Sequence, residues 1–310
     1  MRGVSFLGLS LALVATGLAS PALAHAGHVH AGVSLPWTWD PWITVPLAVT
    51  AGLYGLGVAR LWRRAGFGRG VRPGRVAMFA AGWLALAAAL VSPLHALGER
   101  LFTAHMIEHE MLMVVAAPLI ALARPIGAML WGLPQGWRRG LGGAARARPL
   151  AALWHGLTDP LAATVLHGVA IWAWHMPVLF EAALASEWMH GLQHASFLFS
   201  ALLFWWALIH GRASRHGYGP AVGHLFTTTL HTGVLGALFL FSGRLWYPPQ
   251  ADEAARWGLT ALQDQQFAGL VMSVPACAVY PVAGLVLAGL WISQSGRLRR
   301  MGPGHVVHAP

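Results

Sequence analysis

Seven apolar stretches, separated by more polar segments, run along the chain. They cover residues 43–62, 76–95, 101–122, 159–180, 188–210, 220–241 and 264–292. A helix needs about 20 residues to cross the hydrocarbon core of a bilayer, and unpaired backbone groups in lipid are too costly for open, irregular structure. The pattern therefore predicts an all-α integral membrane protein, with a seven-helix transmembrane bundle over residues 43–296.

A further apolar stretch opens the chain and has the layout of a secretory signal peptide. Arg2 precedes an apolar core from Phe6 to Ala19, and Ala22-Leu23-Ala24 forms a cleavage site of the A-x-A type. We expect residues 1–24 to be removed, which makes His25 the mature N-terminus. Without cleavage the stretch becomes a membrane anchor with Arg2 inside. In both cases residues 25–42 form a His-rich segment on the outer, periplasmic face.

The arginines predict the orientation of the bundle. All 20 basic residues are arginines, and with the N-terminus outside, 16 of them fall in inner segments. Only Arg100, Arg244 and Arg256 fall in outer loops. Because inner loops carry the excess of basic residues, we expect the N-terminus outside and residues 297–310 as a cytoplasmic tail. The chain is expected to cross its membrane several times.

Composition supports this class and excludes others. Hydrophobic residues make up 56% of the chain and charged residues 10%, whereas a soluble domain has about 25% charged residues. The net charge of +10 does not indicate nucleic-acid binding, because the arginines lie between apolar segments. Residues 123–158, the longest inner segment, contain no P-loop or dinucleotide fingerprint. The single cysteine, Cys277, excludes a disulfide within one chain.

Histidines carry the chemistry that the sequence suggests. The chain has 17 of them, and an ionisable residue inside a bilayer is a functional candidate by default. Six have similar predicted depth near the outer surface and could share one layer: His95, His105, His109, His175, His190 and His194. His167, His224 and His231 lie deeper or nearer the inner side, where we interpret them as hydrogen-bonded packing residues.

Two of the predicted helices repeat one pattern. Residues His105 and His109 enclose Glu108, and residues His190 and His194 enclose Gln193. Positions i, i+3 and i+4 share one face of a helix, with the i and i+4 Cβ atoms about 5–6 Å apart. Imidazole suits zinc, copper, iron and nickel, whereas thioether favours Cu(I). The pattern thus predicts a metal or haem site, although Met106 points about 100° away from His105.

The carboxylate in the first pair has several possible roles. Glu108 could be a ligand, a residue that orients an imidazole, or a proton carrier. It could also be the general base of a zinc hydrolase with an H-x-x-E-H motif. We do not favour the hydrolase, because the second pair carries Gln193 and a catalytic zinc needs only three protein ligands. We expect Asp264 and Gln265 to cap the last helix.

Two other redox sites were weighed. A di-iron membrane oxidase requires further histidine boxes such as H-x-x-H-H, which the sequence lacks. A bis-His haem needs one histidine from each of two facing helices, and several of the predicted helices could supply them. A membrane haem protein or redox enzyme therefore stays the alternative, because spacing alone does not distinguish copper from haem.

Four ordered blocks resemble the CtaG family, the multi-helix bacterial cytochrome c oxidase assembly factors, which are distinct from the single-span copper chaperone of the same name. The first runs from His105-Met-Ile-Glu-His109 through Ala117-Pro118-Leu119 to Arg124-Pro125. The others are HGVAIWAWHMPVLFEAAL (167–184), HGLQHASFLFSALLFWW (190–206) and DQQFAGLVMSVPA (264–276). The likeness covers residues 40–295. The family more often has Gln at position 108 and an apolar residue or Met at position 110.

The resemblance implies a non-enzymatic assembly factor, located in the bacterial inner membrane, that inserts copper at the binuclear centre of a haem–copper oxidase. Its partners would be the oxidase catalytic subunit, a periplasmic copper chaperone and membrane lipid, with no nucleic acid. Carried over by position, the metal-handling residues are His105, His109, His175, His190 and His194, beside which Glu108 and Met106 are further candidates. The metal would be copper as Cu(I). The carboxylates of Glu108 and Glu110, which stand where the family more often has other residues, favour a harder ion. His25, His28 and His30, in HAGHVH, could capture copper on the outer face.

Overall fold

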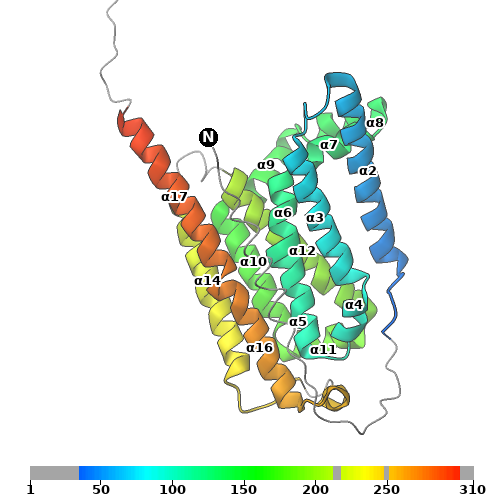
Figure 1. Ribbon diagram of the computed structural model, residues 1–310, viewed down its shortest axis with the longest axis vertical. Coiled ribbons are helices and arrows are strands. Elements are labelled where there is room, and N and C mark those ends of the chain that lie inside the picture. Colours follow the sequence, from blue (N-terminus) through cyan, green and yellow to red (C-terminus); the bar gives the residue numbers. More distant parts are fainter. Residues whose placement is uncertain (1–34, 212–217, 248–250, 301–310) are drawn as a thin grey trace, which may run out of the picture. The chain divides into compact units, whose positions relative to one another are not determined.

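The computed structural model describes residues 35–211, 218–247 and 251–300 (Figure 1). Every regular element in these residues is helical, so the all-α prediction is confirmed there. The expected signal peptide, the three histidines His25, His28 and His30, and the last ten residues lie outside the described part of the chain. Those predictions stay untested.

Five helical runs in the described residues are long and apolar enough to cross a membrane. This result identifies a membrane protein. The five are α2 (Pro41–Ala65), α3 (Pro73–Leu90), the run Phe102–Ala123, α12 (Glu187–His210) and the run Ala261–Ser293. The run Phe102–Ala123 contains α5 (Phe102–Glu110), a π-helix (Met111–Ala116) and α6 (Ala117–Ala123). The last run joins α16 (Ala261–Cys277) to α17 (Val279–Arg300).

The two other predicted spans are less regular. Helix α14 (Gly219–Leu240) has 22 residues, but its two histidines and four threonines make it more polar than the five runs. The single helix expected over 159–180 is wrong: α10 (Pro160–Trp174) and α11 (Pro177–Ala185) meet at an angle of 73°. Counting this bent pair as one span gives six, so the number seven stays a prediction.

Proline explains the bend between α10 and α11. Pro177 has no N–H to donate and pushes the preceding residue out of helical geometry. Met176 is accordingly extended, with φ −70° and ψ 133°. His175 therefore sits at the C-terminal end of α10, at the break itself, and not within a continuous helix.

The region after α3 departs from the prediction in the same way. Helix α3 ends at Leu90, and a separate short helix, α4 (Pro93–Gly98), begins at Pro93 with Ser92 as its cap. Helix α4 packs against α5. A Cβ on Gly98 would lie 2.9 Å from Oε2 of Glu108 and 3.3 Å from Cα of His105. Glycine at this position thus allows α4, with His95, to approach the helix that carries Glu108.

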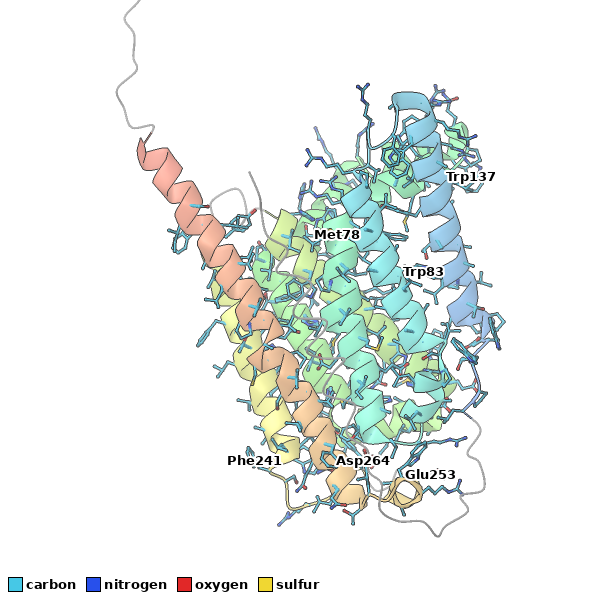
Figure 2. The ribbon with its side chains drawn as sticks, in the orientation of Figure 1. Met78, Trp83, Trp137, Phe241, Glu253 and Asp264 are labelled. Atoms are coloured by element: carbon cyan, nitrogen blue, oxygen red, sulfur yellow. The ribbon has the colours of Figure 1, made fainter. Side chains whose placement is uncertain are left out.

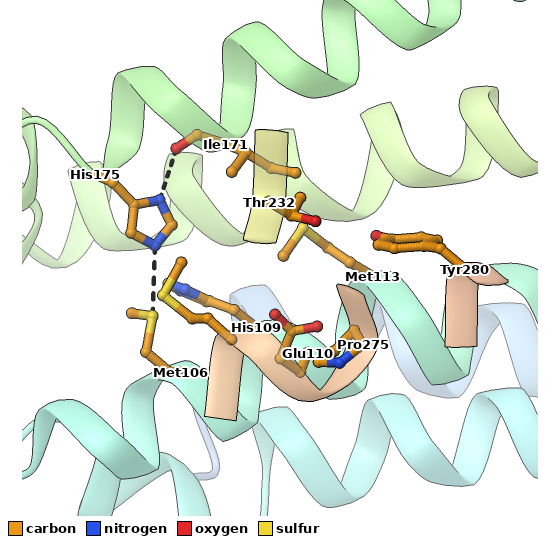
Figure 3. A pocket seen from close by; sticks show the side chains of 10 residues that line it. Met106, His109, Glu110, Met113, Ile171, His175, Thr232, Pro275 and Tyr280 are labelled. Carbon is orange, nitrogen blue, oxygen red and sulfur yellow. Dashed lines mark hydrogen bonds between the residues drawn. The ribbon is translucent and has the colours of Figure 1, made fainter. Parts of the chain in front are cut away.

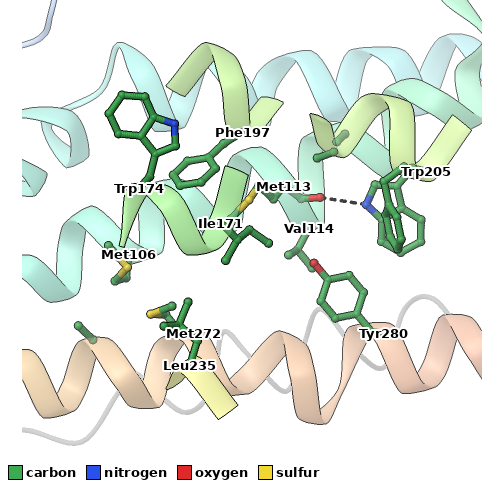
Figure 4. Packing of buried hydrophobic residues seen from close by; sticks show 14 of the residues in the cluster. Met106, Met113, Val114, Ile171, Trp174, Phe197, Trp205, Leu235, Met272 and Tyr280 are labelled. Carbon is green, nitrogen blue, oxygen red and sulfur yellow. Dashed lines mark hydrogen bonds between the residues drawn. The ribbon is translucent and has the colours of Figure 1, made fainter. Parts of the chain in front are cut away.

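The π-helix after Glu110 has a cause in the sequence. The N–H of Ala117 bonds to the carbonyl of Leu112, five residues back. The next carbonyl, that of Met113, would need the N–H of residue 118, which is Pro118. The indole Nε1–H of Trp205 donates to this carbonyl at 3.0 Å (Figure 4). Trp205 on α12 thereby pairs a carbonyl that the proline leaves without a partner in its own helix.

Close helix contacts hold the remaining elements around α5. Helix α14 packs on α16, where a Cβ on Gly269 would lie 2.7 Å from the carbonyl oxygen of Gly236. Helix α16 in turn packs on α5, and α12 packs on α10 and α6. The other described elements are α7 (Pro125–Gly132), α8 (Gln135–Ala144), α9 (Arg148–Leu157), α15 (Ala251–Ala254) and a 3₁₀ turn (Ala255–Trp257).

Helix α2 has chemically different ends. At its start, the N–H of Thr38 bonds to the carbonyl of Val91 at 2.9 Å, beside α4. At its other end, Nη1 of Arg60 donates to three carbonyls at the end of α7. Asp264 lies at the opposite end of the helices from Trp137 on α8 (Figure 2). The end of α2 that carries Arg60, Arg63 and Arg64 is thus remote from α4 and His95 (Figure 1). This arrangement agrees with the predicted orientation, which itself stays a prediction.

Candidate metal centre

Three helices bring five histidines into one buried region. Helix α4 supplies His95, α5 supplies His105 and His109, and α12 supplies His190 and His194. Ring centroids are 4.2 Å apart for His105 and His109, 4.4 Å for His190 and His194, and 5.3 Å for His105 and His190. We call these five residues, together with Glu108, the histidine cluster. The two pairs singled out in the sequence therefore face each other.

Glu108 lies at the centre of the histidine cluster and is fully buried. Its Oε1 is 2.6 Å from Nδ1 of His95 and 3.8 Å from Nε2 of His194. One ligand atom each from His95, Glu108 and His194 lie within 4.8 Å of one another, and the same holds for His105, Glu108 and His190. The carboxylate can therefore share an ion with histidines of either pair.

Sequence reasoning placed His95 at the right depth but not among the expected ligands. The signal was weak, because His95 stands alone and outside the two i, i+4 patterns. In the structure His95 makes the shortest contact of Glu108. If the carboxylate is ionised, it accepts the Nδ1–H of His95, which leaves Nε2 of His95 as an acceptor. A carboxylate that orients an imidazole in this way is common beside protein metal ions.

Many polar atoms of the histidine cluster have no hydrogen-bond partner among the described residues. They include both ring nitrogens of His105 and His109, Nε2 of His190 and His194, and Oε2 of Glu108. Both amide atoms of the buried Gln193 are also without a partner. Buried polar groups are normally paired, and each unpaired one costs about 1–3 kcal/mol. A bound metal ion would satisfy several at once, and imidazole with carboxylate suits copper, zinc or iron.

His175 and Met106 form a second group, on the other side of His109. The ring of His175 is 6.4 Å from that of His109, and its Nε2 is 3.4 Å from Sδ of Met106. Its Nδ1 is 2.6 Å from the carbonyl oxygen of Ile171. The structure thus separates these two predicted ligands from the histidine cluster, with His109 between them.

This second group borders a small cavity of about 10 Å³ (Figure 3). His109 and His175 line it, and so do residues that sequence reasoning did not include in the site. The additional side chains with chemical interest are Glu110, Met113, Met272 and Tyr280. Helical phase directs Met106 away from His105, and Met106 lines this cavity together with Met113. Met272 comes from α16; its predicted depth is similar to that of the histidines, but the sequence does not show that α16 packs beside α5.

Asp264 positions α5, the helix that carries four of the candidate ligands: His105, Met106, Glu108 and His109. The expectation that it caps its own helix is wrong, because Thr260 and Gln263 form a capping box at the start of α16. Asp264 instead accepts the backbone N–H groups of Phe102 and Thr103, at 2.7 and 3.0 Å. These are the first N–H groups of α5, whose own preceding residue provides no side-chain cap. The carboxylate also lies at the positive end of the α5 dipole.

A loop residue fixes the backbone at His175. The hydroxyl of Tyr247 donates to the carbonyl oxygen of His175 at 2.7 Å. Burial raises the pKa of Tyr247, with a smaller contribution from the charge of Glu181, so the phenol keeps its proton. Gln265, also expected as a cap, holds this loop instead, because its side chain bonds to the backbone of Arg244 and Trp246.

Comparisons with known proteins agree with the resemblance noted in the sequence. Residues 52–294 match the family described as cytochrome c oxidase caa3 assembly factor. The chain is also similar to the uncharacterized proteins Mb0105 of Mycobacterium bovis and MT0111 of Mycobacterium tuberculosis. Each is 27% identical over 273 residues, which cover 84% of this chain and 40% of the relative.

The chain thus spans less than half the length of these curated relatives. No solved structure matches it. The family match, by contrast, covers well over half of the chain and contains the histidine cluster from His95 to His194. The protein belongs to the Caa3_CtaG family, the family of cytochrome c oxidase caa3 assembly factors.

Proposed function

We propose that the protein is an assembly factor for a haem–copper cytochrome c oxidase, and that it binds copper and helps to insert it at the binuclear centre. The family match supports the assembly role. The observation that supports metal handling is the histidine cluster, where five imidazoles and one carboxylate meet and many of their polar atoms lack a hydrogen-bond partner among the described residues.

The position of the cluster suits this role. It lies between helices that belong to candidate membrane spans, α5 and α12, and is buried between them. In the predicted orientation it sits near the outer surface, on the side from which a periplasmic copper chaperone would deliver. The receiving partner would be the oxidase catalytic subunit, to which the ion passes without entering lipid.

Haem is less compatible with the packing. Ring centroids in the cluster are as close as 4.2 and 4.4 Å, and a flat macrocycle needs an open slot between its two axial ligands. The cavity beside His109 has a volume of about 10 Å³, which suits one water or one ion. A hydrolytic role is also disfavoured, because five imidazoles meet around Glu108, whereas a catalytic zinc needs only three protein ligands.

The test is metal content of the detergent-purified full chain after anaerobic loading with Cu(I). The wild type is compared with a His105→Ala/His190→Ala variant, which removes one imidazole from each pair. The matched control is His167→Ala/His224→Ala, because these histidines lie in α10 and α14 and bond to Ser200 and Thr164.

We expect the wild type and the control to retain equal copper and the cluster variant to retain less. Equal copper in all three proteins would contradict a role of the cluster. Absence of copper together with a Soret band in the purified wild type would replace the proposal with the haem alternative. Absence of both would leave an assembly factor that does not handle the metal itself.

We also propose that His25, His28 and His30 capture copper on the outer face. A free N-terminal amine and imidazole at His25 can chelate one ion, and the other two histidines add donors. Replacing all three with alanine should slow oxidase maturation only when copper is scarce. Unchanged maturation under scarcity would remove this part of the proposal.

A further inference from the structure

His175 and Met106 meet in a way that ordinary hydrogen bonding does not explain. The carbonyl oxygen of Ile171 can only accept, so the ring nitrogen 2.6 Å from it, Nδ1 of His175, must carry the proton. In a neutral imidazole Nε2 then has a lone pair and no hydrogen. It faces Sδ of Met106 at 3.4 Å, and a thioether has no hydrogen to donate either. Two lone pairs thus face each other in a buried site.

A cation between these two atoms would turn the unfavourable contact into a favourable one. Charging the imidazole instead would place an unpaired positive charge in a buried site, which is costly. A thioether selects soft ions, and imidazole accepts them, so the pair suits Cu(I). Zinc binds sulfur mainly as the charged cysteine thiolate, and magnesium binds oxygen ligands, so an uncharged thioether does not favour either ion.

The cavity beside this pair supplies what such an ion needs. His109 lines it, with both of its ring nitrogens lacking a partner. Met113 and Met272 add two more thioethers to its wall, and Glu110 adds one carboxylate. His109, Glu110 and Met113 all line this cavity (Figure 3). A single negative charge would balance a monovalent cation in this cavity, where Glu110 is the only acidic residue among the described lining residues.

We propose that this cavity is a second metal position, separate from the histidine cluster, which holds Cu(I) through Sδ of Met106, Nε2 of His175 and a nitrogen of His109. The inference rests on the proposed copper-handling function. His109 belongs to both groups, with its ring 4.2 Å from that of His105 and 6.4 Å from that of His175. An ion can therefore pass between the two positions by exchanging ligands at His109.

The two positions differ in the type of ligand that they offer, and this difference suggests a separate role for each. The cavity offers thioethers and imidazole and keeps copper in the reduced state. The histidine cluster offers imidazoles and the Glu108 carboxylate, a harder set. We infer that the cavity stores Cu(I) in the interior and that the cluster, which includes the partly exposed His190, is the position of exchange with partners.

The test uses the full chain, grown with selenomethionine and loaded anaerobically with Cu(I) alone. X-ray absorption at the copper edge then detects selenium bound to copper. Met106→Leu removes one thioether with little change in volume, so the fold should tolerate it. Met78→Leu is the matched control, because Met78 is an exposed residue of α3. Glu108→Gln weakens the histidine cluster and leaves the cavity ligands in place.

We expect a copper–selenium signal in the wild type, in Met78→Leu and in Glu108→Gln. In Met106→Leu the signal should fall, and Cu(I) affinity measured by competition with a chelator should drop at least about tenfold. Copper bound only by nitrogen and oxygen, with unchanged affinity in Met106→Leu, would refute the second position and leave the proposed function intact. Loss of the copper–selenium signal in Glu108→Gln would show that the cavity and the histidine cluster form a single site, which would refute a separate second position. No copper in any of the proteins would refute both proposals.

Discussion

Replacing Asp264 should loosen the helix that carries the candidate ligands. Asp264 is 2% exposed and accepts the N–H groups of Phe102 and Thr103, at 2.7 and 3.0 Å. In addition, the hydroxyl of Thr103 donates to the backbone carbonyl of Asp264 at 2.9 Å. Asp264→Ala would leave two N–H groups at the start of α5 without their acceptor.

The cost follows from the number and kind of bonds lost. A hydrogen bond to a charged group contributes about 1.5–3 kcal/mol, and a carboxylate at a helix N-terminus adds about 0.3–1 kcal/mol. Because one side chain makes both bonds, the contributions overlap, and we expect Asp264→Ala to lower the free energy of unfolding by about 2–4 kcal/mol. Asp264→Asn, which keeps one oxygen acceptor without charge, should fall between the alanine variant and the wild type.

The assay is equilibrium unfolding in mixed detergent micelles, followed by tryptophan fluorescence, together with retained copper. The control is Asp159→Ala, because Asp159 is exposed and caps only its own helix, α10, through Leu161 and Ala162. Loss of such a cap costs about 0.5–2 kcal/mol and should leave copper unchanged. If Asp264→Ala is no less stable than Asp159→Ala and retains wild-type copper, the reasoning about α5 is wrong.

Three further predictions concern positions that shape the same region. Trp205→Phe should lower the free energy of unfolding by about 1–3 kcal/mol, because the Met113 carbonyl loses its partner. Trp206→Phe is the control. An equal cost in both variants would contradict the explanation of the π-helix. Gly98→Ala places a Cβ 2.9 Å from Oε2 of Glu108 and should weaken copper binding about tenfold. Competition with a chelator measures this affinity, and an unchanged value would show that the Glu108 side chain can move aside. Gly269→Ala should destabilise the protein by about 1–3 kcal/mol through forced separation of α14 and α16, and unfolding that matches the wild type would refute that contact.

The helices and the depth of the histidines could be predicted from the sequence because both depend on local patterns. Apolar length located α12 to within one residue and α2 to within three residues at each end. The i, i+4 spacing placed His105 with His109 and His190 with His194 before any contact between helices was known. Pro177 is a local signal for the break at His175, whereas apolar length alone predicts one continuous helix over 159–180.

What the sequence could not provide is the arrangement of helices in space. His95 approaches Glu108 because α4 folds back on α5 at Gly98, which is a tertiary contact without a local signature. Asp264 looks like a cap of its own helix, and only the packing of α16 on α5 directs it to Phe102. Met272 joins the cavity for the same reason.

The most direct test of the central claim is the copper content of the oxidase itself. The catalytic subunit is purified from cells that express either the wild-type protein or Glu108→Gln with His95→Ala, and copper is measured per haem. The account predicts that the variant yields oxidase with normal haem and depleted copper at the binuclear centre. Fully metallated oxidase from cells with a stably expressed variant would contradict the claim that this cluster hands copper to the enzyme.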